Sequence, residues 1–177
     1  MRVRIMLAGV ALLCACTIPA GPPPPAPVPV PAAPALDTAA NAIARDLLAE
    51  VNRTREAHGA RALRRDSVLD RAASEHALEL AERRTLDHVS TDPGRRTVTT
   101  RIEAAGGTWS RAAENLANMS GPAADVPART ARMWLDSEGH RRNMLDPAYT
   151  HTGMGIAIDR RGVWYVTQLY VLPSAGR

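Results

Sequence analysis

The sequence lacks phenylalanine and lysine, and it contains only two cysteines, Cys14 and Cys16. Two cysteines close to the N-terminus cannot build the disulfide framework of a small secreted scaffold, so the core alone must hold the domain together. All 22 basic residues are arginines, and no segment alternates arginine clusters with aromatic residues, which argues against nucleic-acid binding. With 45% hydrophobic residues over 177 positions, we expect one packed domain with appendages.

Residues 1–16 have the features of a bacterial lipoprotein signal peptide. A basic start precedes an apolar run over residues 5–13, which is too short to cross a bilayer as a helix. Leu13 stands three residues before Cys16 and Ala15 directly before it, so Cys16 is the expected site of lipid attachment. We therefore expect an extracytoplasmic protein that is anchored in the membrane, at the cell surface or in the periplasm. The alternative is an ordinary signal peptide and secretion.

Residues 17–36 form a proline-rich linker, with nine prolines between Pro19 and Pro34. Proline fixes φ and removes the N–H donor, so this stretch favours neither helix nor sheet. We expect an extended spacer of the polyproline type that lifts the domain, residues 37–177, off the membrane. A ligand for proline-recognising domains is the competing interpretation.

The first half of the domain predicts helices. Apolar residues at helical spacing over residues 43–51 indicate a helix that stops near Gly59. A second helix is expected behind Asp66 as its N-cap, with His76 on the apolar face as a hydrogen-bonded core residue rather than a ligand. A short helix is expected over residues 98–105.

The second half predicts one more helix and a hairpin. The helix begins behind Asp125, and Gly139 marks a break just before His140. Residues 153–158 and 163–172 read as two antiparallel strands. Helices followed by strands indicate an α+β domain or an α/β/α three-layer sandwich with a central antiparallel sheet.

Six segments, in order, resemble the CAP superfamily of cysteine-rich secretory, antigen 5 and pathogenesis-related proteins, in its short bacterial form. They are Leu48–Arg55 with Gly59, Ala73 to His76 with His88, Glu114–Ala117, Trp134–Leu145, Gly153–Gly155 and Tyr165–Tyr170. The resemblance covers roughly residues 40–172 and implies an α/β/α sandwich with a central cleft. It also implies a tetrad of two histidines and two acidic residues, in which His88, His140 and Glu114 occupy three positions. The second acidic position falls on Ser137, which departs from the family pattern.

Two imidazoles and a carboxylate are suitable ligands for Zn²⁺ or another divalent metal, with water in the open fourth position. No His-Glu-x-x-His helix supports hydrolysis, however, and the polar groups would equally serve to fix the walls of the cleft. Arg141, Arg142 and Asn143 are expected to anchor the turn after the helix, or to bind an anionic ligand. We therefore expect a cell-envelope binding module that takes a lipid, an envelope polymer or a protein through this His/Glu cleft. The alternatives are a metal-dependent hydrolase of envelope substrates and a purely structural protein.

Overall fold

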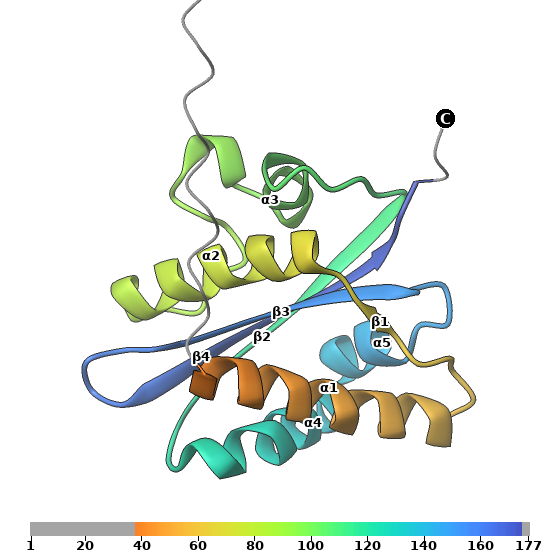
Figure 1. The fold of residues 1–177 in the computed structure, drawn as a ribbon, viewed down its shortest axis with the longest axis horizontal. Coiled ribbons are helices and arrows are strands. Elements are labelled where there is room, and N and C mark those ends of the chain that lie inside the picture. Colours follow the sequence, from red (N-terminus) through yellow and green to blue (C-terminus); the bar gives the residue numbers. More distant parts are fainter. Residues whose placement is uncertain (1–37, 175–177) are drawn as a thin grey trace, which may run out of the picture. The chain divides into compact units, whose positions relative to one another are not determined.

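The computed structural model describes residues 38–174, which form helices on both sides of one sheet (Figure 1). The helices are α1 (Thr38–Ala57), α2 (Ser67–Arg83), α3 (Val98–Ala104), α4 (Val126–Asp136) and α5 (Glu138–Leu145), with short 3-10 helices at Pro93–Arg95 and Ala123–Asp125. The strands are β1 (Arg64–Arg65), β2 (Arg111–Ser120), β3 (His151–Ile158) and β4 (Val163–Leu172). The expected signal peptide (residues 1–16), the linker (residues 17–36) and Cys16 lie outside the described residues.

The sheet has the strand order β1-β3-β4-β2. The three long strands are antiparallel, and β3 and β4 form the predicted hairpin. The two-residue strand β1 pairs parallel to the start of β3, so the sheet is mixed rather than purely antiparallel. A strand of two exposed arginines has no alternating pattern, and only the neighbouring β3 makes it a strand.

Helices α2 and α3 lie on one side of the sheet, and α1, α4 and α5 lie on the other (Figure 1). The larger core is on the second side, where Leu47, Trp134 and Met144 are completely buried. This arrangement confirms the predicted three-layer α/β/α sandwich. It also leaves β2 as one edge of the sheet, with helices of both layers beside it.

Helix α2 packs directly on the backbone of β3. A Cβ atom at Gly153 would lie 2.1 Å from the carbonyl carbon of Leu69, and one at Gly155 would lie 2.1 Å from the carbonyl oxygen of Ala73. The two glycines are thus required by close approach of a helix and a strand, because any side chain would push α2 away.

The helix boundaries were predicted correctly in part. Asp66 caps α2 as expected, accepting hydrogen bonds from the backbone N–H groups of Val68 and Leu69. The break before His140 is at Ser137, which has extended backbone angles (φ −94°, ψ 123°), whereas Gly139 lies inside α5. The expected break at Gly139 was therefore wrong. Glycine permits a break but does not require one, and tertiary packing of α5 decided its place.

Asp125 also differs from the expectation. It precedes α4, but its side chain makes no capping hydrogen bond, and it belongs to the 3-10 turn that leads into the helix. Pro127 in the first turn fits the start of α4 as predicted.

Candidate functional site

A cleft opens where the edge strand β2 runs between the two helical layers. Its volume is about 400 Å³. Its lining residues come from the α2–α3 loop, from α3, from β2 and from α5: His88, Val89, Thr97, Val98, Ala113, Glu114 and Asn143. Because side chains alternate along a strand, Glu114 faces the α2 and α3 layer, and its neighbour Asn115 faces α5. The edge of the sheet is therefore the floor of the cleft.

Glu114 is the buried centre of the cleft. Its side chain is 3% exposed, and its two oxygens have different partners. His88 Nδ1 lies 2.9 Å from Oε1, and Arg101 Nη2 donates to Oε2 at 2.5 Å. The Arg101 side chain is 2% exposed, so this ion pair is shielded from water. The carboxylate therefore has two partners, of which Arg101 is a buried cation.

His88 differs from Glu114 because its ring reaches solvent, with 60% of the side chain exposed. The hydrogen bond to Glu114 raises the pKa of His88 above its usual value of 6.5, although partial burial opposes the shift. A protonated ring has two N–H donors, and Glu114 occupies one of them. The other, at Nε2, is the donor that His88 can offer to a ligand.

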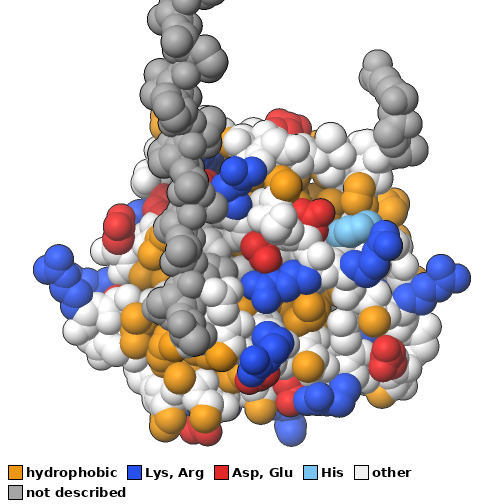
Figure 2. Space-filling view, viewed as in Figure 1, with side chains coloured by type: hydrophobic (Ala, Val, Ile, Leu, Met, Phe, Trp, Pro, Cys, Tyr) orange, Lys and Arg blue, Asp and Glu red, His pale blue; other side chains and the backbone are white. Residues whose placement is uncertain are grey.

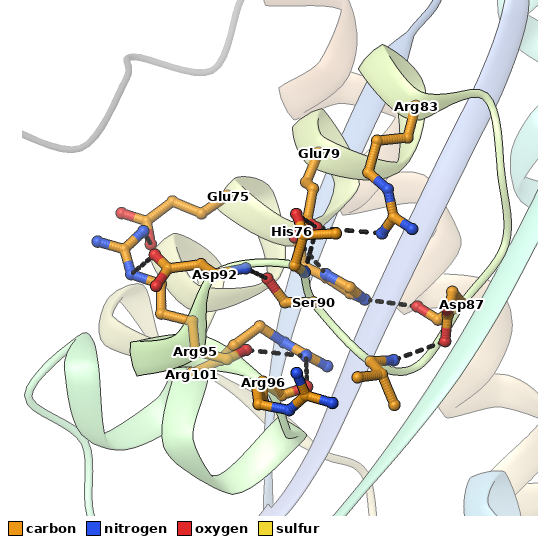
Figure 3. A network of polar contacts seen from close by, with 12 residues as sticks. Glu75, His76, Glu79, Arg83, Asp87, Ser90, Asp92, Arg95, Arg96 and Arg101 are labelled. Carbon is orange, nitrogen blue, oxygen red and sulfur yellow. Dashed lines mark hydrogen bonds and ion pairs between the residues drawn. The ribbon is translucent and has the colours of Figure 1, made fainter.

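The loop between α2 and α3 that carries His88 is tied to α2 by a polar network (Figure 3). His76, whose side chain is completely buried, donates from Nε2 to the carbonyl of Asp87 at 3.0 Å. Burial lowers the pKa of His76. The prediction of a hydrogen-bonded core histidine is thus confirmed.

Further contacts hold the rest of this loop. Glu79 accepts from the N–H and the hydroxyl of Thr91, both at 2.8 Å, and Arg95 pairs with Glu75 at 2.6 Å (Figure 3). Arg101 also donates to the carbonyl of His88 at 3.2 Å. One arginine therefore fixes both the backbone of His88 and the carboxylate that His88 contacts.

The opposite wall of the cleft is α5, which is held in place by hydrogen bonds from side-chain amides. Asn115, which is completely buried, donates to the carbonyl of His140 at 3.0 Å and to the hydroxyl of Tyr170 at 3.2 Å. Asn143 donates to the carbonyl of Glu114 at 3.3 Å and to Asn115 Oδ1 at 3.0 Å. Asn143 was expected to anchor a turn after the helix, but it lies inside α5, where its amide ties this helix to β2.

The end of α5 is held by Arg55, a completely buried arginine of α1. It donates to the carbonyls of Met144, Asp146 and Tyr149 at 2.5, 3.1 and 3.1 Å. A cation at the carbonyl end of a helix is favourable, so Arg55 fixes α5 both geometrically and electrostatically.

The four tetrad positions have different surroundings in the fold. His88 and Glu114 are in contact, as described above. Burial lowers the pKa of His140, and the charge of nearby His88 adds to that shift. Ser137 lies at the extended break between α4 and α5, and its side chain does not cap α5.

This arrangement does not provide the three-ligand zinc site that the sequence suggested as one option. Both oxygens of Glu114 are engaged, and one faces the cation of Arg101. Zinc in a catalytic site requires three protein ligands that lie close together. Across residues 38–174, no group of three histidine, cysteine, aspartate or glutamate side chains could hold a metal ion.

Arg101 is the residue of the site that sequence reasoning missed. It lies three residues after Val98 and four before Ala105, so it shares the side of α3 that packs on the core. An arginine at a core-facing position of a short amphipathic helix was a usable signal, since such a cation is almost never buried without a partner.

None of the helices in the described part of the chain is long and apolar enough to cross a bilayer. On the face seen in Figure 2, basic and acidic side chains are interspersed. This face therefore lacks the single-sign charge that characterises many polyanion-binding surfaces.

Known proteins resemble this chain in sequence. The model of the cysteine-rich secretory protein family, CAP, matches residues 48–170. Over 120 residues the chain is 28% identical to the protein YkwD of Bacillus subtilis, and over 129 residues it is 33% identical to the membrane protein YlbC of the same organism. These matches cover 68% and 72% of this chain but only 43% and 34% of the two relatives, so the chain spans less than half of either.

Solved structures also resemble the fold. An outer surface protein of Borrelia burgdorferi matches with a TM-score of 0.66 at 20% identity, over 75% of this chain and 94% of its own. An extracellular protein of Bacillus anthracis that contains an SCP domain matches with a TM-score of 0.63 at 25% identity, over 75% of this chain and 41% of its own. Since the family model spans most of the domain, the chain belongs to the cysteine-rich secretory protein (CAP) family, with a domain of the type found in bacterial extracellular proteins.

Proposed function

We propose that this protein is a cell-envelope binding module that holds a lipid, an envelope polymer or a protein in the cleft beside β2. In this proposal the lipid on Cys16 anchors the chain in the membrane, and the proline-rich linker presents the domain to the envelope. The relatives include a membrane protein and an extracellular protein, which supports a site of action outside the cytoplasm.

The observation that carries the proposal is the set of contacts made by the carboxylate of Glu114. This buried carboxylate lies between two partners, Arg101 at Oε2 and His88 at Oε1. The carboxylate therefore serves to hold His88 in place. A site whose groups are fixed in advance in this way supports the binding proposal.

The cleft also has the composition of a binding site. Val89, Val98 and Ala113 supply an apolar surface, while His88 and Asn143 supply hydrogen-bonding groups. When His88 is protonated, it and Arg101 carry two positive charges against the single negative charge of Glu114. The cleft thus favours a ligand with an apolar body and an anionic or acceptor group.

The test uses the purified protein and three probes: phosphatidylglycerol vesicles, peptidoglycan sacculi and a display library of random heptapeptides. Val89→Asp places a charge in the apolar part of the cleft at a residue that is 42% exposed, so the fold should tolerate it. Met133→Asp makes the same change at a residue that is 45% exposed and outside the cleft.

We expect at least one probe to bind, with an affinity that Val89→Asp weakens about tenfold and Met133→Asp leaves unchanged. Equal effects of the two variants, or no binding of any probe, would refute the proposal. Turnover of a peptide or ester that is lost on chelation and on His140→Ala would replace it with a metal-dependent hydrolase.

A further inference from the structure

On one half of the free edge of β2, two backbone carbonyls accept hydrogen bonds from side chains of α4. The carbonyl of Leu116 accepts from Trp134 Nε1 at 3.1 Å, and that of Ser120 accepts from Arg129 Nη1 at 2.7 Å. Even-numbered residues of β2 therefore point their backbone groups away from β4. Side chains of α4 thus occupy two carbonyls of this half, and covering a sheet edge in this way is common in proteins.

The other half of the edge, from Ala112 to Glu114, is open. The carbonyl of Glu114 accepts from Asn143 at 3.3 Å. Within residues 38–174, no hydrogen bond is made to the N–H of Glu114 or to the N–H and carbonyl of Ala112. Ala113 and Glu114 line the cleft, so this open edge lies on its floor.

The two walls of the cleft suit the alternating side chains of an extended peptide. A strand laid beside β2 would send successive side chains to opposite sides of the sheet, at a period of two residues. On one side they meet Val89, Val98 and the exposed ring of His88; on the other they meet Asn143. Both N–H groups of the Asn143 amide are used within the protein, which leaves its Oδ1 as an acceptor.

Building on the proposed function, we propose that the open edge from Ala112 to Glu114 binds an extended segment of an envelope protein by β-strand addition. The segment carries an acidic and an apolar side chain two residues apart, facing His88 and the two valines. On its other face it carries a hydroxyl or amide donor for Asn143. Backbone hydrogen bonds to Ala112 and Glu114 provide affinity, and the side chains provide specificity.

The regular repeat of donors and acceptors is what separates a polypeptide from the other ligand classes. A backbone strand offers N–H and carbonyl groups in register with those of β2, whereas a lipid chain offers none and a glycan has no matching spacing. A polypeptide is therefore the ligand that uses the unpaired edge as well as the walls.

The variant Ala112→Pro tests the backbone edge of β2 separately from the side chains that line the cleft. The N–H of Ala112 points away from β4, so proline removes a docking donor without removing a bond of the β2–β4 ladder, and edge strands tolerate proline. Asn118→Pro is the matched control, because it has the same orientation on the same strand but lies outside the cleft. Circular dichroism and thermal unfolding verify that both variants fold.

The experiment selects peptides from the random heptapeptide library on the wild-type protein and measures their affinity for each variant. Each selected peptide is then resynthesised with single backbone N-methyl groups at successive positions. We expect Ala112→Pro to weaken binding about tenfold or more and Asn118→Pro to leave it unchanged. N-methylation should weaken binding at alternate residues only, because only those amides face β2.

Three outcomes would overturn this inference: equal binding to Ala112→Pro and wild type, an N-methyl pattern without alternation, or no enriched peptide. If vesicles or sacculi still bind and Val89→Asp still weakens that binding, the proposed function stands and only the inference of strand addition fails. If no probe binds, both proposals fall.

Discussion

The buried ion pair between Arg101 and Glu114 gives the sharpest test of how the cleft is held. Arg101→Met keeps much of the side-chain volume but removes the cation from a carboxylate that is 3% exposed. It also removes the hydrogen bond to the carbonyl of His88. The remaining partner, His88, is on the solvent side and compensates only part of the charge.

The expected loss of stability follows from the burial of the Glu114 carboxylate. Removing one partner of a buried ion pair costs about 3–5 kcal/mol, because the other charge is left without compensation in a poorly solvated site. That is a large part of the stability of an ordinary domain, which is about 5–15 kcal/mol. Urea unfolding monitored by circular dichroism gives the free energy of unfolding by linear extrapolation.

Two further variants make the result decisive. Arg132→Met removes an arginine from the exposed pair with Asp136, whose side chains are 77% and 61% exposed, and should cost less than about 0.5 kcal/mol. The double variant Arg101→Met/Glu114→Leu removes both buried charges and should recover most of the loss, about 3 kcal/mol of coupling. The reasoning is refuted if Arg101→Met costs no more than Arg132→Met, or if the double variant recovers nothing.

Three other predictions follow from the same structure. Gly155→Ala should destabilise the domain by about 3 kcal/mol or more, because its Cβ would lie 2.1 Å from a backbone oxygen of α2. Gly139→Ala, with no atom within 4 Å of the added Cβ, should stabilise it by about 0.5–1 kcal/mol in thermal unfolding; equal signs for the two would contradict the packing described. Imidazole titration by NMR should place the pKa of His88 above 6.5, and Glu114→Gln should lower it; an unchanged value would show that the hydrogen bond to Glu114 is not its cause. Burial alone would raise the pKa of Glu79, but hydrogen bonds from Ser90 and Thr91 outweigh it and lower the pKa from 4.5 to about 2. The stability that Glu79 contributes is therefore present above pH 4.5 and lost as the pH falls towards 2, and Glu79→Gln should remove roughly 1–2 kcal/mol of that acid dependence after solvent screening.

The local elements could be predicted because their causes are local. The N-cap of α2 at Asp66, the hairpin of β3 and β4, and the core position of His76 each depend on residue type and spacing within a few turns or one hairpin. The family resemblance extended this to the layer order and to the candidate residues His88 and Glu114.

Tertiary structure alone decided what those residues can do. The contact between Glu114 and Arg101 joins a strand to a helix, and the sequence of neither segment indicates that the other is its partner. The position of α5 is held in the same way by Arg55 and Asn115, which come from distant segments of the chain.

The sequence by itself determined α1 to α4, the hairpin and the chemical types available to a cleft, since periodicity and capping act over short distances. Which partners the carboxylate oxygens of Glu114 have, which strand edge stays open and which histidine reaches solvent depended on how three layers pack around β2. Those properties arise from burial and from partners far apart in the chain, and only the folded structure brings the partners together.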